Sequence, residues 1–184
     1  MSTRTNILIE GAECDIGRTR ILLYRHCEGY PADTGADILA KLTANAKRTG
    51  EPSQDWILQC SSFRRFVMAF LNDRYEQASY EKEPRAIYEL TDCLSGDIEH
   101  FYVLRFDVAE GGDKLNGIWH AARRREDGEL DIWMRRQTLY TPATFAALVN
   151  RDRAESNRRI AELRRAHPKN PAFNDDYPLI EVPA

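Results

Sequence analysis

The chain has 184 residues, of which 42% are hydrophobic and 30% charged, and its formal net charge is −3. This length suits one domain with a core that needs no disulfide staples, and the composition excludes wholesale disorder. The sequence shows neither an apolar leader nor a run of about 20 apolar residues, so we expect a soluble, cytoplasmic protein without a membrane span.

The sequence also limits the chemistry that we expect. It has no phosphate-binding Gly-x-x-x-x-Gly-Lys-Ser/Thr motif, no dinucleotide-binding Gly-x-Gly-x-x-Gly motif and no Gly-x-Ser-x-Gly nucleophile motif. The four cysteines form no Cys-x-x-Cys pair, and the spacing of Asp97, Glu99 and His100 is irregular for metal ligands. We therefore expect free thiols in a reducing compartment, and we assign no metal ion, cofactor or catalytic residue.

The first elements predicted along the chain are two strands. Apolar residues at 6–10 and 18–26 flank a turn, a pattern typical of a β-hairpin. The second strand must end near His26, because Gly29 and Pro31 continue neither a strand nor a helix. A loop therefore connects this strand to the next element.

This loop is the first candidate site, because a loop between a strand and a helix is held by a rigid framework and often carries function. Two interpretations remain open. His26 and Glu28 share one side of an extended segment and suit general acid–base chemistry, or they bond each other or the backbone and only shape the turn. The candidate binding residues of the loop are Arg25, His26, Glu28 and Tyr30.

Two helices are predicted next. Asp33 or Thr34 is the expected cap of the first helix, which has a variant capping box that ends at Asp37 and stops before Gly50. The second helix is predicted at residues 53–71, where apolar side chains recur at helical spacing. Its wide apolar face indicates a principal helix of the core.

Four strands are predicted after these helices, separated by turn-forming glycine and aspartate residues. Their alternating pattern gives the sheet one core face and one wetter face. The wetter face is a second candidate surface, because Trp119 and Trp133 would lie there with Arg123 and Arg135, unless helices cover it and the tryptophans belong to the core. The strands are expected at residues 85–91, 100–109, 116–125 and 129–137.

The last predicted helix begins with Thr141 as its cap and Pro142 as its first residue, and Pro168 ends it. Its apolar stripe thins in the second half, so we expect the helix to run past the domain into solvent or onto a partner. Residues 1–168 are predicted to form one domain, followed by an extended tail at residues 169–184. The candidate binding residues of this helix are Arg158, Arg159, Arg164 and Arg165.

Charge is unevenly distributed along the chain. Residues 114–165 contain 12 Lys and Arg against 7 Asp and Glu, a local charge of +5 that leaves −8 for the rest. Such a region can attract nucleic acid or an acidic protein, although no known nucleic-acid-binding module accompanies it. A nucleic-acid-binding alternative would use the last helix together with Arg123, Arg124, Arg125, Arg135 and Arg136.

Strands and helices occur in separate runs, which favours an α+β fold over a parallel α/β fold. We predict an antiparallel sheet, made of the N-terminal hairpin and the four-strand meander. Two central helices and a long C-terminal helix pack with it.

The segment before the first helix carries a short motif, Tyr24-Arg25-His26-Cys27-Glu28-Gly29-Tyr30-Pro31. It resembles a segment of small uncharacterised bacteriophage and prophage proteins, which have Tyr, a basic residue, His, a variable position, an acidic residue, Gly, Tyr and Pro at the end of an early strand. Glu28 stands where those proteins carry Asp. The resemblance implies a non-enzymatic accessory protein that binds a bacterial host or defence protein, for instance to inhibit a defence or nucleic-acid-processing complex. It assigns no catalytic residue.

Overall fold

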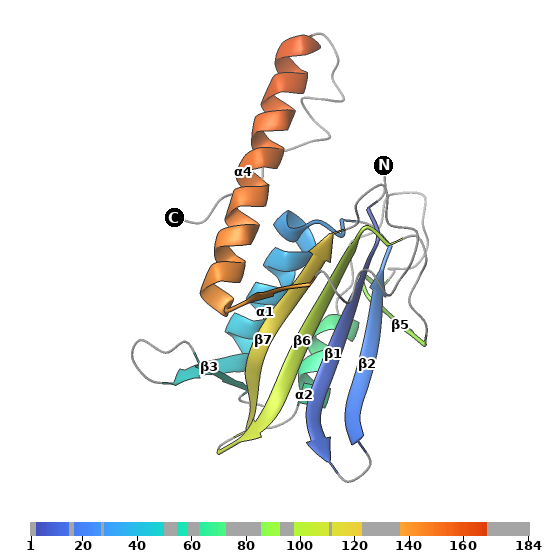
Figure 1. Cartoon of the computed structure of the whole chain (residues 1–184). Helices are drawn as coiled ribbons and strands as arrows, with labels where there is room; N and C mark the ends of the chain where they lie inside the picture. The colour runs from blue at the N-terminus through green and yellow to red at the C-terminus, as the bar shows by residue number, and fades with distance from the viewer. Residues whose placement is uncertain are drawn as a thin grey trace.

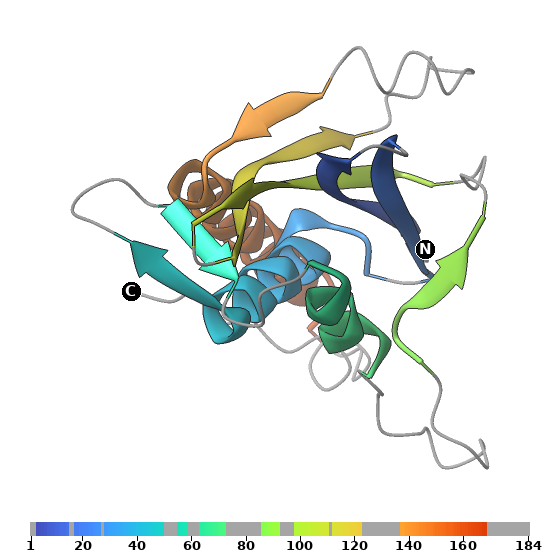
Figure 2. The ribbon, with the colours of Figure 1, turned by 90° about the horizontal axis from the view of Figure 1, so that it is seen from below.

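The structure is a computed structural model that describes residues 3–14, 17–26, 28–49, 55–58, 63–72, 86–92, 98–110, 112–122 and 137–168. Within these ranges, the strands form a single sheet with helices against one of its faces (Figures 1 and 2). The predicted α+β class is therefore confirmed. The tail predicted at residues 169–184 lies outside the described residues.

The elements follow one another with several changes between strand and helix. In chain order they are β1 (Thr5–Cys14), β2 (Gly17–Arg25), the π-helical turn η1 (Pro31–Gly35), α1 (Ala36–Asn45), β3 (Ala46–Thr49), β4 (Asp55–Leu58), α2 (Phe63–Leu71), β5 (Glu89–Thr91), β6 (His100–Ala109), β7 (Gly112–Ala122), β8 (Thr138–Tyr140) and α4 (Pro142–Ala166).

The sheet is mixed, and the prediction of a purely antiparallel sheet is wrong. Its strand order is β3-β4-β7-β6-β1-β2-β5, and β8 also pairs with β7. The β1–β2 hairpin and the β6–β7 pair are antiparallel as predicted, but β1 runs parallel to β6. Alternation within a strand shows which face is buried, whereas the choice of neighbouring strand depends on contacts between distant segments.

One buried carboxylate joins three neighbouring strands. Glu10 on β1 lies opposite Arg20 on β2 and opposite Arg105 on β6 in the two registers. The Nε atoms of both arginines donate to the Glu10 carboxylate at 2.8 Å. Because a buried charge is costly unless it is paired, this arrangement favours the register in which all three residues meet.

Two element predictions need correction in the middle of the chain. The helix predicted at residues 53–71 is a strand, β4, at Asp55–Leu58, and α2 begins only at Phe63. The first predicted helix ends at Asn45, and β3 follows and pairs with β4. Aromatic and β-branched residues such as Trp56 and Ile57 favour strands, and periodicity alone does not separate a short buried strand from a helix.

The predicted meander is confirmed only in its middle. β6 has the predicted bounds, and β7 begins at Gly112, earlier than expected. β5 is shorter than predicted and pairs with β2 at the sheet edge, not with β6. The strand predicted at residues 129–137 falls outside the described residues, except for Gln137, and β8 follows it.

The main core lies between the sheet and its helices. Phe66 and Phe70 of α2 meet Phe106 of β6 and Tyr88 through edge-to-face ring contacts. Burying each such side chain contributes about 1.5–3 kcal/mol, so this layer is the main source of stability. Other fully buried members are Ile7, Ile9, Leu23, Ile38, Leu42, Leu58, Tyr102, Leu104, Ile118 and Phe145.

The opposite face of the sheet carries a smaller buried cluster, made of Ile98, Phe101, Val103 and Ala121. Trp119 is partly buried against it, and the Arg105 guanidinium lies 4.8 Å from the centre of the Trp119 ring. The predicted wetter face therefore combines aromatic and cationic groups at Trp119, and its tryptophan also packs as part of a cluster. The other residues predicted there, Arg123, Trp133 and Arg135, lie outside the described residues.

The last helix, α4, begins as predicted, with Thr141 as its cap and Pro142 in the first turn. The Thr141 and Thr144 side chains form a reciprocal capping box. The helix spans 25 residues, and its second half projects past the end of the sheet (Figure 1). No helix within the described ranges combines the length and the apolar composition needed to cross a membrane.

The half-buried His100 and the buried His120 form a pair on the helix-facing side of β6 and β7. His100 Nδ1 lies 3.0 Å from His120 Nε2, and Tyr102 stacks on the His120 ring. Burial lowers the pKa of His100 to about 4. Burial and the neighbouring His100 lower the pKa of His120 to about 3. Both imidazoles are therefore neutral in the native state at neutral pH.

This pair makes stability depend on pH. The free energy of unfolding should fall as the pH drops from about 6.5 towards about 4, because the unfolded chain binds protons on imidazoles that the native state keeps neutral. His120→Gln should make this fall shallower, and His26→Gln, at an exposed side chain, is the matched control. Urea titrations over this pH range give the measurement. An identical pH dependence in wild type and His120→Gln would contradict the assignment.

Candidate functional site

The loop that follows β2 is anchored at Gly29. The Gly29 N–H donates to the Thr3 carbonyl at 3.0 Å, and the Tyr102 hydroxyl donates to the Gly29 carbonyl at 2.9 Å. A Cβ atom at Gly29 would lie 3.0 Å from the backbone of Arg4. Gly29 therefore allows a close backbone approach that fixes the loop against the N-terminal segment.

Glu28 adopts a left-handed backbone conformation, with φ at 59°. A non-glycine residue in this region costs about 1–3 kcal/mol and persists only where its surroundings hold it. Here the Thr34 hydroxyl donates to the Glu28 carbonyl at 2.7 Å. The prediction that Asp33 or Thr34 caps the helix is wrong, because the helical segment already begins at Pro31 and no side chain caps it.

The structure separates the four candidate residues of the loop into two groups. Arg25 and Glu28 come together, with Arg25 donating to the Glu28 carboxylate. His26 is exposed, and its Nδ1 lies 3.2 Å from the Tyr24 hydroxyl. Tyr30 is also exposed, and its ring meets His100 edge-to-face. Glu28 thus forms its ion pair with Arg25, while the His26 ring lies against Tyr24.

A hydrogen-bonded chain connects Arg25 to α1. Arg25 donates to the Tyr88 hydroxyl at 3.0 Å, and that hydroxyl donates to one oxygen of Asp37. Lys41 approaches the other Asp37 oxygen at 3.0 Å. The Lys41 ammonium also lies 5.1 Å from the centre of the Phe70 ring. The charged groups at this end of the core are therefore paired with one another.

These contacts set the protonation of the buried groups. Burial lowers the pKa of Arg25, but Tyr88 and Glu28 raise it by more, so its pKa is higher than usual. Burial also raises the pKa of Tyr88 above its ordinary value, although the Arg25 charge acts against this shift. At neutral pH the network therefore contains a charged guanidinium and a protonated phenol.

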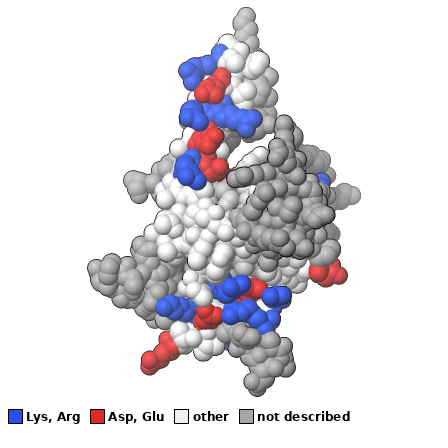
Figure 3. Space-filling model, viewed as in Figure 1, with Lys and Arg blue, Asp and Glu red and all other residues white. Residues whose placement is uncertain are grey.

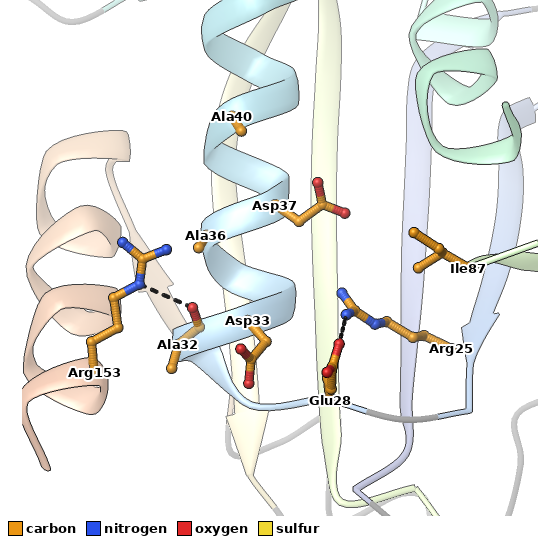
Figure 4. A pocket seen from close by; sticks show the side chains of 9 residues that line it. All are labelled: Arg25, Glu28, Ala32, Asp33, Ala36, Asp37, Ala40, Ile87 and Arg153. Atoms are coloured by element: carbon orange, nitrogen blue, oxygen red, sulfur yellow. Dashed lines mark hydrogen bonds and ion pairs between the residues drawn. The ribbon is translucent and has the colours of Figure 1, made fainter. Parts of the chain in front are cut away.

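A cavity of about 370 Å³ opens beside this network (Figure 4). Its walls come from β2, the loop, η1, α1, α4 and the segment before β5. Carboxylates line one side, three alanines line the surface of η1 and α1, and an arginine of α4 stands on the far side (Figure 4). The lining residues are Arg25, Glu28, Ala32, Asp33, Ala36, Asp37, Ala40, Ile87 and Arg153.

Two consecutive residues of α4 hold η1 at the cavity wall. Asp152 accepts a hydrogen bond from the Ala32 N–H at 2.8 Å. Arg153 Nε donates to the Ala32 carbonyl at 3.1 Å. Both polar groups of the Ala32 peptide backbone are thus satisfied by α4, and this contact fixes the position of α4 relative to α1.

No family model, curated protein or solved structure matches this chain. In the part of the chain that the structure describes, no group of three or more His, Cys, Asp and Glu side chains is placed to hold a metal ion.

The four candidate arginines of α4 lie apart from the cavity. With a rise of 1.5 Å per residue, Arg165 stands about 18 Å along the helix axis from Arg153. Arg158 lies 3.9 Å from Glu155, and Arg165 donates to the Ala161 carbonyl of its own helix. The structure therefore does not unite the two sets of candidate residues. The arginines at positions 123–125, 135 and 136 lie outside the described residues.

Sequence reasoning found Arg25 and Glu28 but missed most of the polar groups that line or support the cavity. Asp37 and Lys41 are spaced i, i+4 in a predicted helix, which is a recognisable signal for an ion pair. Asp33 was interpreted only as a possible cap. Tyr88 and Arg153 carry no local signal, because both reach the site through tertiary contacts with distant segments.

Tyr88→Phe should destabilise the protein by about 1–3 kcal/mol, because it leaves a buried donor of Arg25 and an oxygen of Asp37 without their shared partner. Tyr30→Phe is the matched control, since it removes the hydroxyl of an exposed tyrosine. Urea denaturation followed by circular dichroism compares the two. If Tyr88→Phe unfolds at the same urea concentration as the control, the network does not have the structural role assigned to it.

Proposed function

We propose that this chain is a non-enzymatic accessory protein of phage or prophage origin that binds and modulates a bacterial protein complex. An inhibitor of a defence or nucleic-acid-processing system fits this description. The observation that supports it best is the shape of α4, which extends beyond the domain that anchors it (Figure 1). The short resemblance of residues 24–31 to phage proteins supports the origin.

Among the described residues, the side chains that anchor α4 to the domain lie in its first half. Phe145 and Val149 are its buried residues, and Asp152 and Arg153 bond to η1 just beyond them. A single helix gains little stability from its own hydrogen bonds in water, and no side chain in the projecting half of α4 is buried among the described residues. A projecting helix of this kind suits a surface that a partner covers.

The chemistry of the projecting half suits an acidic protein partner. Residues 154–166 contain four arginines and two glutamates. Figure 3 shows basic and acidic side chains along this part of α4. Leu163 is 37% exposed among them. Arginine is enriched at the centres of protein interfaces, where it combines a long apolar stem with a forked donor.

The Arg158→Gln/Arg159→Gln double variant should weaken capture of a specific partner from bacterial lysate by the tagged, full-length chain. Arg64→Gln/Arg65→Gln is the matched control, because it removes the same charge from two exposed residues of another helix, α2. Mass spectrometry with isotope-labelled lysates compares the two variants with wild type. A partner lost only with the α4 variant supports the proposal, and a partner retained equally by both variants contradicts it.

The same experiment separates the nucleic-acid alternative. Nuclease treatment of the lysate should leave a direct protein partner on the resin. If the chain binds nucleic acid, the captured material should be lost with nuclease. Binding of a labelled oligonucleotide should then weaken steeply as salt is raised, because phosphate contacts release counterions. That pattern would replace the protein-partner proposal.

A second candidate function is the binding of a small ligand beside the loop. The observation in its favour is the cavity, since two of the predicted loop residues, Arg25 and Glu28, line it. The strained backbone of Glu28 adds to this, because such conformations concentrate at binding sites. His26 is not among the lining residues, so the acid–base chemistry proposed for His26 with Glu28 receives no such support.

A further inference from the structure

The polar side chains that line the cavity differ in whether they have hydrogen-bond or ion-pair partners. Both oxygens of Asp37 have partners, Tyr88 and Lys41. Asp33 is different, because its carboxylate makes no hydrogen bond or ion pair with any residue of the described ranges. Within the described ranges, Arg153 forms one hydrogen bond, from its Nε to the Ala32 carbonyl, and its terminal guanidinium donors bind no acceptor there.

The electrostatic surroundings of Asp33 favour a cation. Burial raises the pKa of Asp33, and the negative charge of Glu28 raises it further. The charges of Arg25 and Arg153 each lower the pKa of Asp33, but by less than burial raises it. Glu28 pairs with Arg25 through one oxygen, Oε2, and its side chain remains 65% exposed. An ammonium group near Asp33 and Glu28 would therefore be stabilised by two carboxylates.

The opposite side of the cavity has the complementary charge. Arg153 stands across the η1–α1 segment from Asp33, with Ala32 and Ala36 between them (Figure 4). These alanines, Ala40 and Ile87 supply apolar surface. A guanidinium with free terminal donors is well suited to bind a carboxylate. One side of the cavity thus carries three carboxylates, of which Asp33 is the one unpaired within the described ranges and Glu28 is paired with Arg25. The other side carries Arg153, with alanine surface between them.

We infer that the cavity binds a small dipolar ligand with an ammonium and a carboxylate group, namely an amino acid or a short peptide. The ammonium would lie at Asp33 and Glu28, the carboxylate at Arg153, and an aliphatic part on the alanines. The volume of about 370 Å³ is at the small end of ligand cavities, which suits a ligand of this size. This inference rests on the second candidate function, and not on the partner-binding role of α4.

Calorimetric titration of the full-length protein tests the inference with L-leucine and leucyl-leucine as dipolar probes. Isopentylamine keeps the ammonium of leucine without its carboxylate, and 4-methylpentanoate keeps the carboxylate without the ammonium. At least one dipolar probe should bind saturably, and each truncated analogue of leucine should bind at least about tenfold more weakly, because one charge of the cavity then lacks its partner. No saturable binding of either dipolar probe, or equal binding of all probes, would overturn the inference.

Two variants should give opposite patterns. Asp33→Asn should weaken the binding of leucine and isopentylamine and leave that of 4-methylpentanoate unchanged. Arg153→Gln should weaken the binding of leucine and 4-methylpentanoate and leave that of isopentylamine unchanged. His26→Ala, outside the cavity, is the control for both. A variant that weakens the binding of all probes equally acts through the fold and contradicts the assigned orientation. The capture experiment with Arg158 and Arg159 tests the partner-binding role separately, so a failure of one proposal can be told from a failure of the other.

Discussion

The buried guanidinium of Arg25 is the constraint on which this end of the molecule depends. Its side chain is only 10% exposed, so its charge must be met largely by protein groups, and Glu28 and Tyr88 provide them. The Tyr88 hydroxyl in turn donates to Asp37 of α1, and Asp37 forms an ion pair with Lys41. One charge at the end of β2 thereby fixes the backbone of the loop, the rotation of α1 and the approach of the segment before β5. The cavity is the space that remains when these requirements are met.

Local signals in the sequence predict much of the fold. The hairpin, the bounds of β6 and the start of α4 each follow from alternation, turns or a cap within a few residues. The strands β3 and β4 were missed because the apolar residues around Trp56 fit a helix as well as a strand. The parallel pairing of β1 with β6 was missed because it joins Thr5 to His100, and no local pattern records such a partner.

The candidate site shows the same division between local and distant information. Arg25 and Glu28 were predicted from their place after a strand, and they line the cavity together. The opposite wall was not predicted, because Arg153 and Ala32 are 121 residues apart in the sequence. Helical periodicity does place Arg153 on a long helix, but it does not indicate which of its many arginines turns back towards the domain. Position in the fold, more than residue type, distinguishes Arg153 from Arg158.

The contact between α4 and Ala32 couples the orientation of the helix to the wall of the cavity. Asp152 and Arg153 grip η1 close to the point where the helix leaves the domain, and the projecting half continues as the same rigid rod. A small rotation of its outer end would displace Arg153 against the cavity wall, and a molecule that pulls on Arg153 would bias the direction of the rod. Thermodynamic linkage makes such coupling reciprocal. If a ligand in the cavity changes the affinity of α4 for a partner, the partner changes the affinity of the cavity for that ligand by the same factor.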